Sequence, residues 1–224
     1  QGADGGKNSS FAVKGGPGAD DIRLGKPVTG GFLLTRFAID IDASATGVRG
    51  IPVLVDGQDG TDTVQLLDTA TAAAIQTTVA FSEQGSAQRI TLTHADTASP
   101  VNVDIMSGVE VVRVSLGSGD DVVQLPAGTY GFDAAVEGNA GSDSLNVEPG
   151  ANFTGHTVRF DGGDGDDLTY VAFAAGVVPN QINLVFDGGM QDGTKGGDKL
   201  QFAGDGLTGG GFYQPSASEA NAGL

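Results

Sequence analysis

Cysteine and tryptophan are absent from this chain of 224 residues, and only three tyrosines occur. Without cysteine, a disulfide framework and a thiolate metal site are both excluded. An aromatic-lined sugar groove is not predicted, because three tyrosines and no tryptophan offer too few aromatic platforms. No run of about 18 consecutive apolar residues occurs, so the sequence predicts no membrane-spanning helix.

Basic residues are also few. The chain has 11 lysines and arginines against 28 acidic residues, a formal net charge of −17. This charge would repel phosphate groups, so neither nucleic acid nor an anionic membrane surface is an expected partner. Only five of the 28 acidic residues are glutamates, and the aspartates gather in glycine-rich turns. Aspartates in such turns either stabilise the turn itself or bind hard cations such as Ca²⁺.

Histidine occurs only twice, as His94 and His156. Neither belongs to a recognisable nucleophile or zinc arrangement, and His94, which ends a strand, is expected at the surface. A polysaccharide-active enzyme would need an arginine beside acids, and Arg113 and Arg159 are the candidates. Both lie in apolar strand alternation, where pairing with turn aspartates is the expected role. The sequence therefore predicts no catalytic residue and no enzyme.

Glycine, in contrast, is abundant (38 residues), and much of it falls in one repeated turn. A glycine is followed two residues later by an aspartate and then by alternating apolar residues, as in GSDSLNV (141–147). This pattern predicts a tight turn that feeds a strand with alternate residues buried. Copies occur in 14–24, 56–66, 115–125, 137–147, 161–171 and 187–202, the last with four extra residues in its turn. Their motif aspartates are Asp20, Asp62, Asp121, Asp143, Asp167 and Asp198.

The recurrence of this turn predicts an all-β, solenoid-like fold, either a parallel β-helix or a β-roll. Motif aspartates 22 and 24 residues apart suit one coil each, and the earlier separations of 42 and 59 suit two and three coils. Residues 77–83, 88–94, 101–107 and 109–116 are predicted as strands of an inserted antiparallel meander. A β-sandwich is the alternative, because Asp-Gly turns also favour hairpins.

The expected organisation is simple. Residues 1–10 are polar and glycine-rich, which predicts a flexible N-terminal arm. Residues 11–203 form a single elongated β domain. Residues 204–224 are rich in glycine, serine, alanine and asparagine, which predicts a C-terminal tail or docking segment.

Two of the turns, GGPGADDI (15–22) and DGGDGDDLT (161–169), follow the pattern G-G-x-G-x-D-x-apolar completely or nearly so. They resemble the calcium-binding repeats of the RTX (hemolysin-type) family of secreted bacterial proteins. The resemblance implies stacked turns in which motif aspartates and turn carbonyls bind Ca²⁺ between neighbours. The implied ligands are Asp20, Asp62, Asp121, Asp143, Asp167 and Asp198, with carbonyls near Gly16, Gly18, Gly163 and Gly165. The isolated turns are also similar in style to the repeats of large bacterial cell-surface proteins.

The copies depart from the RTX pattern in spacing and in composition. RTX repeats run in tandem, whereas these turns are at least 22 residues apart. Leu116 and Asn139 stand where the third and fourth copies should have glycine, and Gln58 interrupts the glycine pair of the second. Ordinary Asp-Gly turns that bind no ion are therefore the alternative.

Together these features predict a secreted bacterial structural protein with Ca²⁺ as its cofactor. It would be a building block of a surface layer, an adhesin stalk or a self-assembling filament, ordered by calcium after export. Self-association into a homopolymer or lattice is expected, because solenoid ends expose strand edges, and the strand FAV (11–13) could add to a neighbour's sheet. The alternatives are a carbohydrate-binding or adhesive module that takes a polysaccharide, and a polysaccharide-active β-helix enzyme.

Overall fold

The computed structural model describes the chain over 11–25, 53–68, 75–84, 86–95, 100–106, 108–174, 181–191 and 196–204. In these ranges all regular secondary structure is β-strand and no helix occurs. Accordingly, the described chain contains no helix long and apolar enough to cross a membrane. The arm predicted at 1–10 lies outside these ranges, as does the tail from 205 onward, while residue 204 ends the last strand.

The strands are β1 (Phe11–Lys14), β2 (Asp21–Gly25), β3 (Val53–Asp56), β4 (Thr63–Leu67), β5 (Thr77–Gln84), β6 (Ala87–His94), β7 (Val101–Ile105), β8 (Val111–Ser115), β9 (Val122–Leu125), β10 (Gly128–Thr129), β11 (Asp133–Glu137), β12 (Ser144–Val147), β13 (Ala151–Asp161), β14 (Leu168–Phe173), β15 (Gln181–Asp187) and β16 (Lys199–Gly204).

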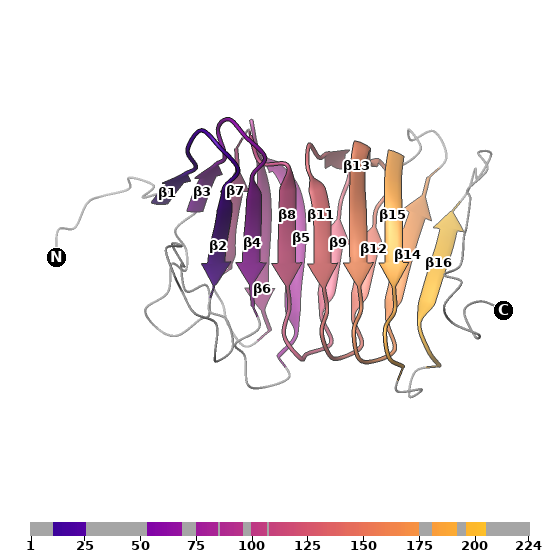
Figure 1. Cartoon of the computed structure of the whole chain (residues 1–224). Helices are drawn as coiled ribbons and strands as arrows, with labels where there is room; N and C mark the ends of the chain where they lie inside the picture. Colours follow the sequence, from indigo (N-terminus) through magenta and orange to yellow (C-terminus); the bar gives the residue numbers. More distant parts are fainter. Residues whose placement is uncertain are drawn as a thin grey trace, which may run out of the picture.

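These strands are shared between two sheets (Figure 1). The nine-stranded sheet has the order β1-β3-β7-β6-β5-β9-β12-β14-β16. The seven-stranded sheet has the order β10-β13-β11-β8-β4-β2, with β15 paired to β13. From β11 onward successive strands lie in alternate sheets, so each strand pairs with the strand one full circuit earlier or later. We call one such circuit through both sheets a coil.

Alternation of apolar and polar residues builds the core between the sheets. In β12, Leu145 and Val147 are 0% and 1% exposed, while the alternating residues Ser144 and Asn146 are only half-buried. Because register is maintained from coil to coil, Leu145 lies beside Val123 of β9 and Thr169 of β14. The buried apolar residues form one continuous cluster from Ile22 to Val171.

The antiparallel meander is confirmed for three of its four predicted strands. β6 pairs antiparallel with both β5 and β7, and the remaining pairings in both sheets are parallel. The fourth segment was assigned wrongly. Within 109–116, β8 leaves the meander and pairs parallel with β4 and β11 in the other sheet. Short-range strand spacing could not show this, because parallel partners lie far away in the sequence.

The all-β prediction is thus confirmed, and the sheets are largely parallel. Neither sheet closes on itself: β1 and β16 are the outer strands of the nine-stranded sheet. In the other sheet β2 lies at one end and β15 at the opposite end, beyond β13. N-terminal and C-terminal strands therefore lie at opposite ends of the stack (Figure 1).

Candidate functional site

The six Gly-Asp turns form two stacks at opposite rims of the sheets. The turns that end at Asp20 and Asp62 carry the chain from the nine-stranded to the seven-stranded sheet, along the upper rim of Figure 1. The other four turns carry the chain in the reverse direction, along the lower rim. Turns of opposite sense lie at opposite ends of the strands, because all strands but β6 run the same way within their sheet.

At the lower rim the motif aspartates form a hydrogen-bonded series, which we call the lower ladder. The backbone N–H of Asp121 donates to Oδ1 of Asp143 at 2.7 Å, and that of Asp143 to Oδ1 of Asp167 at 2.7 Å. Asp167 in turn donates to Oδ1 of Asp198 at 2.8 Å. Thr77 begins the series by donating its N–H to Oδ1 of Asp121 at 2.6 Å. Each carboxyl group therefore ties its own coil to the preceding one, at a net contribution of about 0.5–1.5 kcal/mol per bond when it is neutral and about 1.5–3 kcal/mol when it is ionised.

A shorter upper ladder follows the same rule. The N–H of Asp20 donates to Oδ1 of Asp62 at 2.8 Å, and the N–H of Asp62 donates to Oε2 of Glu110 at 2.7 Å. Glu110 belongs to no Gly-Asp turn, so the repeat pattern missed it. Its position directly before β8, in register with Asp62, follows only from the parallel pairing of β4 with β8.

The ladders correct the predicted coil spacing. Asp20 and Asp62 are 42 residues apart, yet they are direct neighbours and not two coils apart. Asp62 and Asp121 are separated by 59 residues and stand in different ladders. The spacings of 22 and 24 in the lower ladder are one coil each, as predicted. Long connections and the meander change the spacing in sequence without changing the order of the stack.

Glycine lies opposite every motif aspartate except Asp121, where Leu116 takes its place, and in these turns the carboxylate folds back over the start of its own turn. Gly16 donates its N–H to Oδ2 of Asp20 at 2.6 Å. A Cβ placed on Gly138 would overlap Oδ2 of Asp143, and one placed on Gly162 would overlap the carboxylate of Asp167. The repeated glycines are thus explained by close packing within the turn.

Successive turns also close on each other through the backbone. Asp164 donates its N–H to Asn139 O at 2.7 Å, and Met190 donates to Gly163 O at 2.7 Å. A Cβ on Gly165 would overlap the carbonyl oxygen of Gly141 in the preceding turn. These contacts leave the stacked turns in direct van der Waals and hydrogen-bond contact.

Two non-glycine residues occupy the left-handed conformation that glycine normally adopts here. Gln58 and Asn139 both have φ of +72°. The Asn139 side chain compensates for the strain by donating from Nδ2 to Leu116 O at 2.6 Å. Gln58 and Asn139 are two of the three departures from the glycine pattern in the sequence; the third is Leu116.

Burial makes three aspartates of the lower ladder hard to ionise. It raises the pKa of Asp143 to about 8, and it raises those of Asp121 and Asp167 to about 6. Backbone N–H donors lower these pKa values in part, and neighbouring carboxylates raise them further. In all three residues Oδ2 is buried and has no hydrogen-bond partner among the described atoms, as is also true of Asp62.

Several oxygens of the expected calcium ligands already accept hydrogen bonds within the stacked turns. Ca²⁺ takes six to eight oxygen ligands at about 2.3–2.6 Å. In the ladders Oδ1 already accepts a backbone N–H, and the carbonyl of Gly163, one of the implied ligands, accepts the Met190 N–H. No group of three or more His, Cys, Asp or Glu side chains suited to a metal occurs among the described residues. Calcium binding stays a prediction, and in this structure the same aspartates accept hydrogen bonds from neighbouring turns.

A buried polar cluster at the lower rim was missed by the sequence analysis. His94 is 7% exposed, which contradicts the surface position expected for it. Its Nε2 lies 2.9 Å from both carboxylate oxygens of Asp68, which also accepts the Thr77 hydroxyl at 2.7 Å. Because Thr77 also donates to Asp121, this cluster joins the meander to the lower ladder. No local pattern links residues 68 and 94, so only tertiary pairing reveals them.

The arginines considered as enzyme candidates lie on the outer face of the seven-stranded sheet. Arg159 contacts Asp161 at 3.3 Å and Asp187 at 3.6 Å, both at the last strand position before a lower turn. This contact agrees with the expected pairing of the arginine with acids near the turns. Arg113 lies in the same row two strands away, with Ala135 between them.

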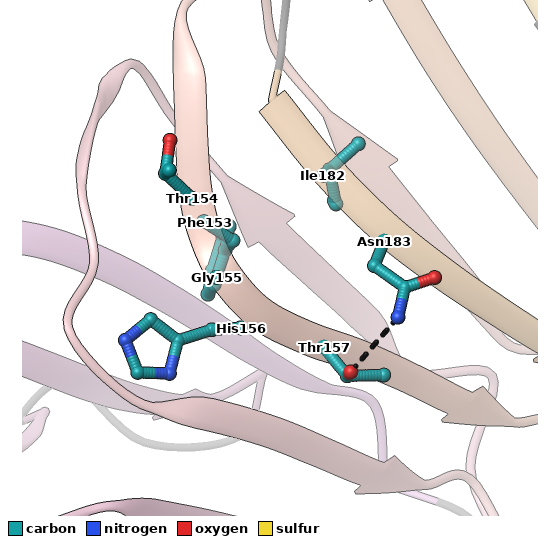
Figure 2. A pocket seen from close by; sticks show the side chains of 7 residues that line it. All are labelled: Phe153, Thr154, Gly155, His156, Thr157, Ile182 and Asn183. Atoms are coloured by element: carbon teal, nitrogen blue, oxygen red, sulfur yellow. Dashed lines mark hydrogen bonds between the residues drawn. The ribbon is translucent and has the colours of Figure 1, made fainter.

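A shallow hollow of about 410 Å³ lies where β13 bulges away from β15 (Figure 2). Polar groups of Thr154, His156, Thr157 and Asn183 line it, with Phe153, Gly155 and Ile182 completing the wall. Asn183 points at Thr157 and donates from Nδ2 to its Oγ1 at 3.0 Å. Phe153 is 1% exposed, so it offers no aromatic platform to a ligand.

Comparison with known proteins adds no relative: no protein-family model, no curated protein and no solved structure matches this chain. The similarity to RTX repeats therefore remains a likeness of the turns alone.

Proposed function

We propose that this chain is a β-solenoid and that it serves as a structural module, a spacer or building block of an extracellular layer, stalk or filament. The observation that supports this most directly is the pair of ladders. Successive coils are joined through backbone, carboxylate and core in an unbroken series, so the distinctive residues of the sequence hold coils to coils.

The polar side chains outside the ladders also form structural contacts. His94 and Asp68 are buried against each other, and Arg159 is engaged by two aspartates on an open sheet face. Arg89 forms a two-pronged pair with Asp104, at 2.6 and 2.8 Å, which fastens β6 to β7. The arginine pairs hold neighbouring strands together and the His94–Asp68 pair links the two sheets, which favours a mechanical role over catalysis.

The mechanical role is tested by stretching the full chain between two marker domains in single-molecule force spectroscopy. A structural module should resist extension and then lengthen in steps that correspond to coils. The Asp143→Ala variant, which breaks the middle of the lower ladder, should yield at lower force, whereas the exposed control Asp164→Ala should behave like wild type. Extension without measurable resistance would contradict the proposal.

A carbohydrate-binding module is the second candidate, on the strength of the hollow beside β13. Hydroxyl, amide and imidazole groups surround it, and these are groups that bind sugar hydroxyls. A glycan array, run with and without calcium, should show binding that Asn183→Ala abolishes if this candidate is right. Turnover of uronate polymers, lost in Arg159→Ala, would instead support an enzyme.

A further inference from the structure

We infer that two copies of this chain stack end to end, with β16 of one copy beside β1 of the next. The inference rests on the proposed structural role and names the partner of its open ends. Both strands are outer strands of the same sheet, and both run in the common direction of its parallel pairs. An outer strand presents unpaired backbone N–H and C=O groups along one side, which another strand can satisfy.

The register of the nine-stranded sheet makes the two ends complementary. One row of backbone positions crosses the sheet at a single level, from Phe11 to Phe202, and its members from Val53 to Val171 are buried. The register pairs Phe11, Val53, Val103, Ile90 and Phe81 in turn, and likewise Leu125, Val147, Val171 and Phe202. Phe81 and Leu125 follow directly on the pair Ala80 and Gln124, so the two series are level. Stacking a second copy in register would place the position of its Phe11 beside Phe202 and continue the row.

Burial along this row shows that its C-terminal end is uncovered among the described residues. The members from Val53 to Val171 are at most 1% exposed, whereas Phe202 is 50% exposed. Met190, in the last turn, is 69% exposed. Covering Phe202 with the next strand would give it the environment that the rest of its row already has.

The seven-stranded sheet continues in the same stacking. Leu184 of β15 is level with Val64 of β4 through the intervening pairs, and Ile22 of β2 pairs with Val64. A second copy would therefore bring its Ile22 beside Leu184, which is only partly buried at present. The apolar positions of both sheets are therefore in register across the contact.

A second copy is favoured as the occupant because a single chain presents both halves of the contact. The pairing is head-to-tail, so each added copy leaves a new free end and the assembly grows as a filament. Growth of this kind fits a stack whose first and last strands, β1 and β16, lie at opposite ends (Figure 1).

Cysteine cross-linking tests the register directly, because the chain has no cysteine of its own. Neighbouring strands are about 4.8 Å apart, which suits the Cα separation of a disulfide, about 4.4–6.8 Å. Mixing Phe11→Cys with Phe202→Cys protein under mild oxidation should give a covalent dimer. The matched control pairs Phe11→Cys with Gln201→Cys, because residue 201 faces the opposite side of the strand and should give little dimer. No dimer in the first mixture, or equal amounts in both, would overturn the inference.

Sedimentation of cysteine-free protein gives an independent test. Wild type should associate as concentration rises, and Phe202→Glu should remain monomeric while its circular dichroism is unchanged. Deleting residues 205–224 decides whether the chain's own C-terminal segment covers this end. Association that appears only after the deletion would overturn stacking of the intact chain. A wild-type monomer that still resists force would defeat stacking and leave the structural role standing.

Discussion

Replacing Asp143 by asparagine keeps an oxygen acceptor for the Asp121 N–H and removes a carboxyl group that burial makes hard to ionise. The pKa of Asp143 rises from its ordinary value of 3.8 to about 8. The folded chain therefore binds this proton more tightly than the unfolded chain does. The stability that Asp143 contributes is fully present below about pH 4 and is lost as pH rises through about 8.

The magnitude follows from the same pKa. One pKa unit corresponds to about 1.4 kcal/mol, so ionising Asp143 lowers the free energy of unfolding by an amount on the order of 5 kcal/mol by about pH 8. Asparagine carries no such cost. Asp143→Asn should be as stable as wild type near pH 4. Near pH 8 its free energy of unfolding should be larger by an amount on the order of 5 kcal/mol.

Urea unfolding followed by circular dichroism, repeated across this pH range, measures the difference. Asp164→Asn is the control, because Asp164 is exposed in the adjacent turn and its replacement should leave the pH profile unchanged. If Asp143→Asn follows wild type at every pH, the buried ladder carboxyl does not control stability and the reasoning fails.

Repeating the urea unfolding at each pH in millimolar calcium and in chelator distinguishes a ladder closed by backbone donors from a calcium site. For a ladder closed by backbone donors, the free energy of unfolding should depend on pH in the same way in both conditions. A calcium site would instead restore wild-type stability near neutral pH, and Asp143→Asn would lose that response. The second result would support the RTX-like prediction over the role argued for these turns.

Three further substitutions test the turns and the core, each by its change in unfolding free energy. Gly163→Ala, at φ +96° and against the Asn139 carbonyl, should be far more destabilising than Gly155→Ala, at φ +80° with no atom within 4 Å; equal losses would contradict the close packing of turns. Gln58→Gly should stabilise by about 1 kcal/mol through relief of backbone strain, whereas Asn139→Gly should not, since it loses its bond to Leu116 O. Phe132→Ala should cost about 3–5 kcal/mol, because its ring contacts the buried aromatic rings around it; a smaller loss would mean that the core there is loosely packed.

Local sequence determined the elements of this protein well. Glycine followed by aspartate and alternating apolar residues was sufficient to predict the strands that leave the turns, such as β12 and β14, because turn geometry and burial alternation act over a few residues. The same pattern identified the aspartates that stack, and the spacing of 24 between Asp143 and Asp167 matched one coil.

Only the tertiary structure decided which turns are neighbours. Asp20 and Asp62 stand together across 42 residues, while Asp62 and Asp121 stand at opposite rims. Parallel pairing joins strands whatever the length of chain between them. The spacing of two turns in the sequence therefore does not show whether they are neighbours. Glu110 and the buried His94 became visible for the same reason: their partners are set by register between coils and by no signal within their own segments.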